Sequence, residues 1–211
     1  MSLPYDAVAA SQALAAADPR LGDLIAAVGP PQIALRPDET LPALLRSIVY
    51  QQLSTKAAAT IHGRVLDAFG TDGALDPEAV HAAHDDALRA CGLSRAKVAA
   101  VRDLGERQRA GTLPTRAELL AMPDAAVVAA LTAVRGVGPW TAQMVLLFNL
   151  GRPDVWPVAD LGVQEGYRIV LGLEARPTAK EMVAVGEPYA PWRSVAAWYG
   201  WRAVHRARGE E

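Results

Sequence analysis

Helix-start signals recur along almost the whole chain, and they constrain its fold more than any other feature. Alternating apolar and polar runs between turn pairs are missing, and residues 32–36 are expected to form only a short extended link. The sequence therefore predicts an all-α fold with short connections of about two to eight residues. The signals are capping residues, alone or with a partner glutamate or proline: Asp18-Pro19, Ser54, Asp76-Pro77, Ser94, Thr115 with Glu118, and Thr178 with Glu181.

Composition agrees with a folded protein that has a sizeable core. The chain has 211 residues, 51% of them hydrophobic, and a formal net charge of −2 with a pI near 6.1. This balance argues against a polybasic nucleic-acid coat, although a local basic face or backbone amides can still bind DNA. One cysteine, Cys91, excludes an internal disulfide and a four-cysteine iron–sulfur site.

The N-terminal segment lacks the basic start and long apolar stretch of a signal peptide. No apolar run approaches the roughly 20 residues that a membrane helix needs. We therefore expect a soluble, cytoplasmic protein.

Basic residues gather in two segments. Residues 95–116 contain six Lys and Arg residues against two acids, and residues 202–208 hold three arginines and a histidine. The favoured interpretation is a solvated helix face, and the alternative is a surface that follows phosphates.

A glycine-rich loop, "VRGVGPWTA" at residues 134–142, lies between a helix predicted over 122–134 and a following apolar run. A dinucleotide-binding fingerprint would need a preceding strand and a third glycine, so it is rejected. Two interpretations stay open. The loop is either an ordinary corner between helices, or a phosphate site in which bare glycines expose the N–H groups of the helix starting at Pro139.

Five segments together resemble the helix-hairpin-helix DNA glycosylase superfamily, in the family's order. The hairpin "LTAVRGVGPWTAQMV" (131–145) is followed by a Gly/Pro-rich loop with an aspartate, "DVWPVADLGVQEGY" (154–167). The other three are "SIVYQQLSTKAA" (47–58), "GLSRAKVAAVRDLG" (92–105) and "PWRSVAAWYGWR" (191–202). The branch that they resemble most is the bacterial 3-methyladenine DNA glycosylase II type.

The resemblance implies two helical lobes with an active-site cleft between them, within one unit over residues 1–211. The central lobe would span about 54–149, with the hairpin at 131–142. The second lobe would combine about 1–53 with 150–211. We expect a compact version without the N-terminal β-sheet lobe of larger relatives.

The implied activity is base excision without strand cleavage. Asp160 takes the catalytic position, where a carboxylate stabilises the positive charge on the sugar and orients the attacking water. Read by itself, Asp160 is an ordinary helix N-cap, and both roles can hold at once. Bifunctional relatives carry a lysine nucleophile where this chain has Trp140, which implies a monofunctional enzyme.

Further site residues are implied by the same resemblance. A cationic damaged base would stack on aromatic faces in a pocket, although each tryptophan could instead be core. Gln52, at the end of a helix predicted over 41–52, would fill the gap left by the flipped nucleotide or simply face solvent. The pocket residues are Trp140, Trp201, Trp156, Met144 and Tyr50, and the phosphate-binding residues are Gly136, Gly138 and Thr141.

No cofactor and no catalytic metal are expected. The resemblance by itself implies a structural monovalent cation at the hairpin carbonyls. The expected partner is double-stranded DNA with alkylated purines such as 3-methyladenine or 7-methylguanine, bound by a monomer. The alternatives are a mismatch or oxidised-base glycosylase, and a non-catalytic DNA-binding module.

Overall fold

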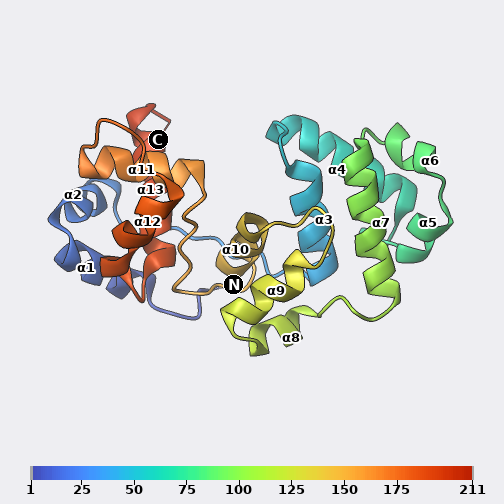
Figure 1. The fold of residues 1–211 in the computed structure, drawn as a ribbon, viewed down its shortest axis with the longest axis horizontal. Coiled ribbons are helices and arrows are strands. Elements are labelled where there is room, and N and C mark those ends of the chain that lie inside the picture. The colour runs from blue at the N-terminus through green and yellow to red at the C-terminus, as the bar shows by residue number, and fades with distance from the viewer. Residues whose placement is uncertain (1, 211) are drawn as a thin grey trace. The chain divides into compact units, whose positions relative to one another are not determined.

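The computed structural model describes residues 2–210 and divides the chain into two compact units (Figure 1). The terminal unit combines the chain through Arg36 with the chain from Leu146 onward, and the central unit is Pro37–Val145. Thirteen α-helices, one short 3-10 helix and one small two-stranded sheet account for the regular structure of these residues, which confirms the predicted all-α fold. In the described part of the chain, no helix is both long and apolar enough to cross a membrane.

The terminal unit is built around α13, which packs against α11, α1 and α2 (Figure 1). Its core contains the fully buried rings of Tyr167, Tyr189 and Tyr199. The helices are α1 (Ala7–Ala17), α2 (Pro19–Val28), α11 (Leu161–Leu171), α12 (Ala179–Gly186), a 3-10 turn (Glu187–Tyr189) and α13 (Arg193–Ala207).

The central unit packs α3 against α4 and α7, with α5 on α7 (Figure 1). Its two-residue strands, β1 (Gly70–Thr71) and β2 (Ala74–Leu75), pair antiparallel across an Asp72-Gly73 turn in which both residues have positive φ, as a tight hairpin requires. The helices are α3 (Thr40–Tyr50), α4 (Thr55–Phe69), α5 (Pro77–Ala82), α6 (Asp85–Ala90), α7 (Arg95–Arg109), α8 (Arg116–Ala121), α9 (Asp124–Thr132) and α10 (Pro139–Phe148), whose last turn belongs to the terminal unit.

The division between the units differs from the expected one at its first boundary. Residues 37–53, assigned from the sequence to the second lobe, belong to the central unit. The reason is packing, because α3 buries Leu44, Leu45, Ile48 and Val49 and its neighbours are α4 and α7. The second boundary, expected near 149, lies at Val145.

The predicted helix starts are confirmed by their hydrogen bonds. Ser54 and Ser94 each accept from a backbone N–H of the first turn of α4 and α7, and Asp18 and Asp76 cap helices that begin with proline. Thr115 and Thr178 form complete capping boxes with Glu118 and Glu181. Helix ends are less well predicted: α3 stops at Tyr50 and α9 at Thr132, both two residues early.

Candidate active site

The hairpin between α9 and α10 exposes its glycines and buries its valines. Val134 and Val137 are 1% and 5% exposed, and the Val137 N–H donates to the Val134 carbonyl over 3.1 Å. Gly136 has φ +80°, a conformation that side chains disfavour, and Gly138 has open space where a Cβ would lie. Since α10 begins at Pro139, the backbone N–H groups of its first turn follow directly on this open glycine.

Asp103 of α7 anchors the hairpin from behind. Its Oδ2 accepts the Arg135 backbone N–H and the Arg107 Nε, each at 2.8 Å, and Arg107 also donates to the Ala133 carbonyl at 2.5 Å. Burial alone would raise the pKa of the Asp103 carboxyl, but the bonds from Arg135 and Arg107 together hold it below its usual value. The loop is therefore fixed through its backbone while its outer surface stays open.

The predicted gap-filling residue lies in a turn that is also held through its backbone. Gln52 is exposed and left-handed, with φ +57°. Lys97 Nζ donates to the carbonyls of Val49 and Gln51, both at 2.8 Å, so it caps the end of α3. Gln51 Nε2 donates to the Gly136 carbonyl at 3.0 Å, which ties this turn to the hairpin. Burial lowers the pKa of Lys97, because removal from water disfavours the charged ammonium.

The basic segment 95–116 largely serves the fold. Arg102 pairs with Asp85 at 2.6 Å, Arg107 with Asp103, and Arg109 with Glu78 at 2.8 Å. Together with Lys97, these side chains bind acids and carbonyls of the central unit. Asp103 lies only four positions before Arg107, but the other partners could not be predicted from the sequence, because they lie as far as 48 positions away.

The other predicted residues of the central unit divide by exposure. Trp140, in the first turn of α10, is 44% exposed, and Met144 is half-buried. Tyr50 is half-buried, with the Arg46 guanidinium 4.3 Å from its ring centroid and His62 packed edge-on. Thr141, in the first turn of α10, is 3% exposed, so its side chain is buried and its part in phosphate binding stays a prediction that concerns its backbone N–H.

Asp160 lies at the start of α11 in the terminal unit, where it caps the helix as predicted. Its Oδ1 accepts the Val163 backbone N–H at 2.8 Å and the Trp201 indole N–H at 2.9 Å. The residue is 7% exposed, and the positive end of the helix dipole favours a carboxylate at this position. Two donors from different elements therefore fix one carboxylate oxygen.

The contact between Asp160 and Trp201 leaves no spare volume. A Cβ at Gly162 would lie 2.8 Å from Trp201 Cδ1 and 3.1 Å from Asp160 Oδ1. One turn further along, a Cβ at Gly166 would overlap the Gly200 carbonyl, so α11 and α13 touch backbone to backbone. The small residues of α11 bring the helices this close and thereby place the Trp201 ring on the aspartate.

The two tryptophans predicted in the pocket from this unit have different environments. Trp201 is half-buried, binds Asp160 and packs against Phe148 with ring centroids 5.7 Å apart. Trp156 is 7% exposed, stacks edge-on against Tyr167 and donates its indole N–H to the Met182 carbonyl at 2.6 Å. Trp156 is therefore a core residue, and we correct its assignment to the pocket on that ground.

The loop that leads to Asp160 is fixed by side chains that the sequence reasoning missed. Arg193 makes two 2.6 Å bonds to the Asp154 carboxylate, and the buried Ser194 Oγ donates to the Arg152 carbonyl and accepts the Val155 N–H. The ion pair holds the pKa of Arg193 above its usual value, with the bond to Asp154 as the largest cause. The only signal in the sequence was the match of "PWRS" to a family segment.

Histidines and acids do not gather into a metal site in the described residues, where no group of three or more metal-ligating side chains occurs. His81 instead contacts Glu106 at 2.5 Å on the surface of the central unit.

Comparison with known proteins places these features in one family. The sequence model described as the HhH-GPD superfamily base excision DNA repair protein matches residues 45–191, a range that includes every predicted site residue except Trp201. DNA-3-methyladenine glycosylase 1 of Schizosaccharomyces pombe is 33% identical over 172 residues, covering 82% of this chain and 75% of that protein.

Two solved structures are similar over almost their whole length. The S. pombe 3-methyladenine DNA glycosylase Mag1, in complex with abasic DNA, has 32% identity and a TM-score of 0.81, and the match covers 92% of this chain and 95% of that one. The DNA-3-methyladenine glycosidase of Bacillus halodurans has 35% identity and a TM-score of 0.84, covering 95% and 91%.

Proposed function

Since the chain belongs to the HhH-GPD superfamily of base excision DNA repair proteins, we propose that it is a monofunctional DNA glycosylase for alkylated purines. It would bind double-stranded DNA as a monomer in the cytoplasm, flip out 3-methyladenine or 7-methylguanine, and hydrolyse the N-glycosidic bond. The product would be an abasic site in an uncut strand. The observation that carries the proposal is the Asp160 carboxylate, whose Oδ1 is fixed by Val163 and Trp201.

Asp160 would act on the sugar. Cleavage of the glycosidic bond develops positive charge near the anomeric carbon, and a fixed carboxylate stabilises that charge without reorganising. The same group orients a water for attack or accepts its proton. Because an alkylated purine already carries positive charge, it leaves readily, so the reaction needs no strong general acid.

Trp201 would connect the catalytic group with the base. Its indole N–H is bound to Asp160, and its half-buried ring offers an aromatic face that suits a cationic purine. Trp140, Met144 and Tyr50 stay predictions as pocket residues. The substrate class is supported by the names of the two relatives that match nearly the whole chain.

The absence of a lyase step is proposed from Trp140, which occupies the place of the lysine nucleophile in bifunctional relatives. Product strands should stay intact until alkali is added, and borohydride should trap no covalent complex. Trapping would instead support the oxidised-base alternative.

The hairpin would bind DNA phosphate with the first N–H groups of α10, and a structural monovalent cation at its carbonyls is part of the proposal. Carbonyl oxygens are suitable ligands for such an ion, but two of them already accept hydrogen bonds: Val134 from Val137, and Gly136 from Gln51. Each carbonyl has a second lone pair, so the set fits a weakly held ion. Replacing K⁺ by a tetraalkylammonium ion at constant ionic strength should weaken DNA binding if the ion is present.

The decisive experiment is release of free base from methylated duplex DNA, with the products identified by mass spectrometry. Asp160→Asn should lower the rate of release by about 10³-fold while duplex binding is kept. Asp23→Asn, an exposed change on α2 of the same unit, should be neutral. If the wild-type protein binds DNA but releases no base, the non-catalytic alternative gains and the proposal fails.

A further inference from the structure

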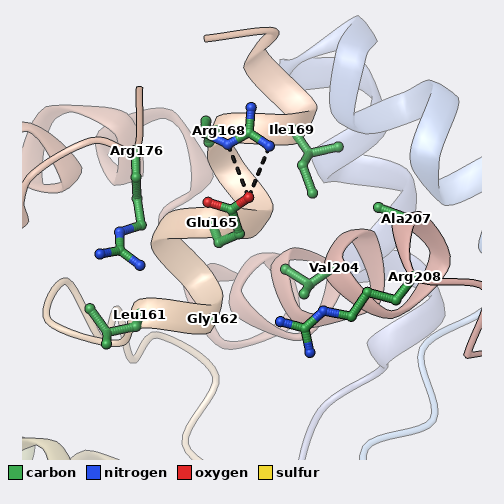
Figure 2. Close-up of a pocket in the computed structure, with 9 residues that line it drawn as sticks. All are labelled: Leu161, Gly162, Glu165, Arg168, Ile169, Arg176, Val204, Ala207 and Arg208. Atoms are coloured by element: carbon green, nitrogen blue, oxygen red, sulfur yellow. Dashed lines mark hydrogen bonds and ion pairs between the residues drawn. The ribbon is translucent and has the colours of Figure 1, made fainter. Parts of the chain in front are cut away.

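A basic pocket of about 430 Å³ lies beside the start of α11, within the terminal unit (Figure 2). One face of α11 forms one wall, the end of α13 forms another, and Arg176 reaches in from the loop after α11. Leu161 and Gly162 line it, and these are the two residues that follow Asp160. The pocket thus begins one residue from the carboxylate proposed to act on the sugar.

The pocket has an excess of positive charge. It holds three guanidinium groups, from Arg168, Arg176 and Arg208, against the single carboxylate of Glu165. Arg168 neutralises that carboxylate through its Nε at 3.0 Å and its Nη2 at 2.9 Å, as the dashed lines of Figure 2 show. Two positive charges are left over, those of Arg176 and Arg208.

These two arginines have no hydrogen-bonded or ion-paired side-chain partner among residues 2–210. Both lie close enough to Glu165 to lower its pKa, behind the larger effect of the Arg168 bond. The arginines of α7 differ, because Arg102, Arg107 and Arg109 each bind an acid of their own unit. Arg176 and Arg208 therefore keep their donors available to a ligand.

We propose that this pocket binds a backbone phosphate of the DNA, held between the guanidinium groups of Arg176 and Arg208. A guanidinium offers two parallel N–H donors to a phosphate, and two of them on one anion fix its position. The exposed Leu161, 61% accessible, suits the apolar edge of a sugar next to that phosphate. Phosphates follow each other closely along a strand, and the pocket begins next to Asp160, so a phosphate that flanks a nucleotide bound at Asp160 would be within reach of it.

This inference rests on the proposed function for the identity of the strand. The pocket would hold the strand that carries the damaged nucleotide and so help to place its sugar against Asp160. The pocket would be a second DNA contact, formed by the terminal unit, whereas the hairpin glycines belong to the central unit.

The test measures binding, not base release. Affinity for an undamaged duplex and for one with a tetrahydrofuran abasic analogue is measured by anisotropy over a range of KCl concentrations. Arg176→Gln/Arg208→Gln should reduce the slope of log affinity against log salt by about 0.9, the value for one lost phosphate contact. Lys180→Gln, an exposed charge on α12, should leave the slope unchanged. Arg208→Lys keeps the charge but not the paired donors, and should recover only part of the affinity.

Neutral methylphosphonates, placed one at a time around the abasic analogue, then locate the phosphate. One position should weaken the wild-type protein and have no effect on the double variant. The inference would be overturned if the double variant kept the wild-type salt slope, or if Lys180→Gln reduced the slope equally. It would also be overturned if no methylphosphonate position weakened the wild-type protein alone.

Two further results distinguish a DNA phosphate from a free one, and the pocket from the catalytic site. Binding of inorganic phosphate that is lost in the double variant, with DNA binding unchanged, would assign the pocket to a free phosphate and overturn the DNA site. If the wild type releases base but the double variant keeps the wild-type salt slope, only the phosphate pocket is disproved. If the double variant has a reduced slope but the wild type releases no base, only the proposed function is disproved.

Discussion

The two units hold their predicted site residues by different means. In the terminal unit, the Asp160 side chain is held in place. The Trp201 indole donates a hydrogen bond to its carboxylate, and the close packing at Gly162 leaves the carboxylate and the ring no room to move. In the central unit, side chains fix backbone: Lys97 binds the carbonyls that end α3, and Gln51 binds the hairpin. A catalytic carboxylate needs one fixed position, whereas a loop that meets DNA needs a fixed backbone and an open surface.

Among the changes that leave the Asp160 carboxylate itself in place, the largest effect should come from filling the space beside it. Gly162→Ala places a Cβ 2.8 Å from the Trp201 ring, so the ring or Asp160 must shift. A displacement near 1 Å can reduce a rate by about 10²-fold, and we expect that loss in single-turnover base release. Gly63→Ala, in open space on α4, is the control and should slightly stabilise the protein. Wild-type turnover in Gly162→Ala would show that the contact with Trp201 is not needed.

A smaller effect should follow from releasing the backbone in the central unit. Lys97→Met leaves two carbonyls at the end of α3 without their donor, which should lower the free energy of unfolding by about 1–3 kcal/mol. The turn at Gln52 should loosen with it. We expect about tenfold weaker binding to a duplex with an abasic analogue, on the basis of about 1.4 kcal/mol.

Lys56→Met, exposed on α4, is the matched control for that change in charge and shape. Stopped-flow fluorescence of 2-aminopurine opposite the lesion separates the two possible defects. If Lys97→Met loses stability but inserts into the duplex at the wild-type rate, Lys97 supports only the fold and does not position Gln52.

The smallest effect distinguishes the two tryptophans of the terminal unit. Trp201→Phe removes the indole donor to Asp160 but keeps an aromatic ring against Phe148, and about fivefold slower base release is expected for one lost hydrogen bond. Trp156→Phe loses its bond to the Met182 carbonyl in the core, so it should lower thermal stability and leave the rate nearly unchanged. The reverse pattern would restore Trp156 to the site and remove Trp201.

Much of the fold could be predicted because its signals are local. A capping residue binds N–H groups two or three positions away, so Ser54, Ser94, Thr115 and Asp160 were recognisable without any knowledge of the rest of the chain. Helix ends were less certain, since α3 ends where Lys97 and a left-handed Gln52 terminate it. The boundary between the units also depended on which helices bury the apolar face of α3.

The sequence by itself determined the order of helices, the bare hairpin and an aspartate at the start of a helix. Only the tertiary structure decided that Trp201 binds Asp160 while Trp156 is core. It also decided that Arg102, Arg107 and Arg109 of α7 are ion-paired, whereas the side chains of Arg176 and Arg208 have no such partner among residues 2–210. The physical reason is the range of the interactions. Capping and turn geometry act within a few residues, whereas the Trp201–Asp160 bond spans 41 positions and exists only once glycines let α11 and α13 touch.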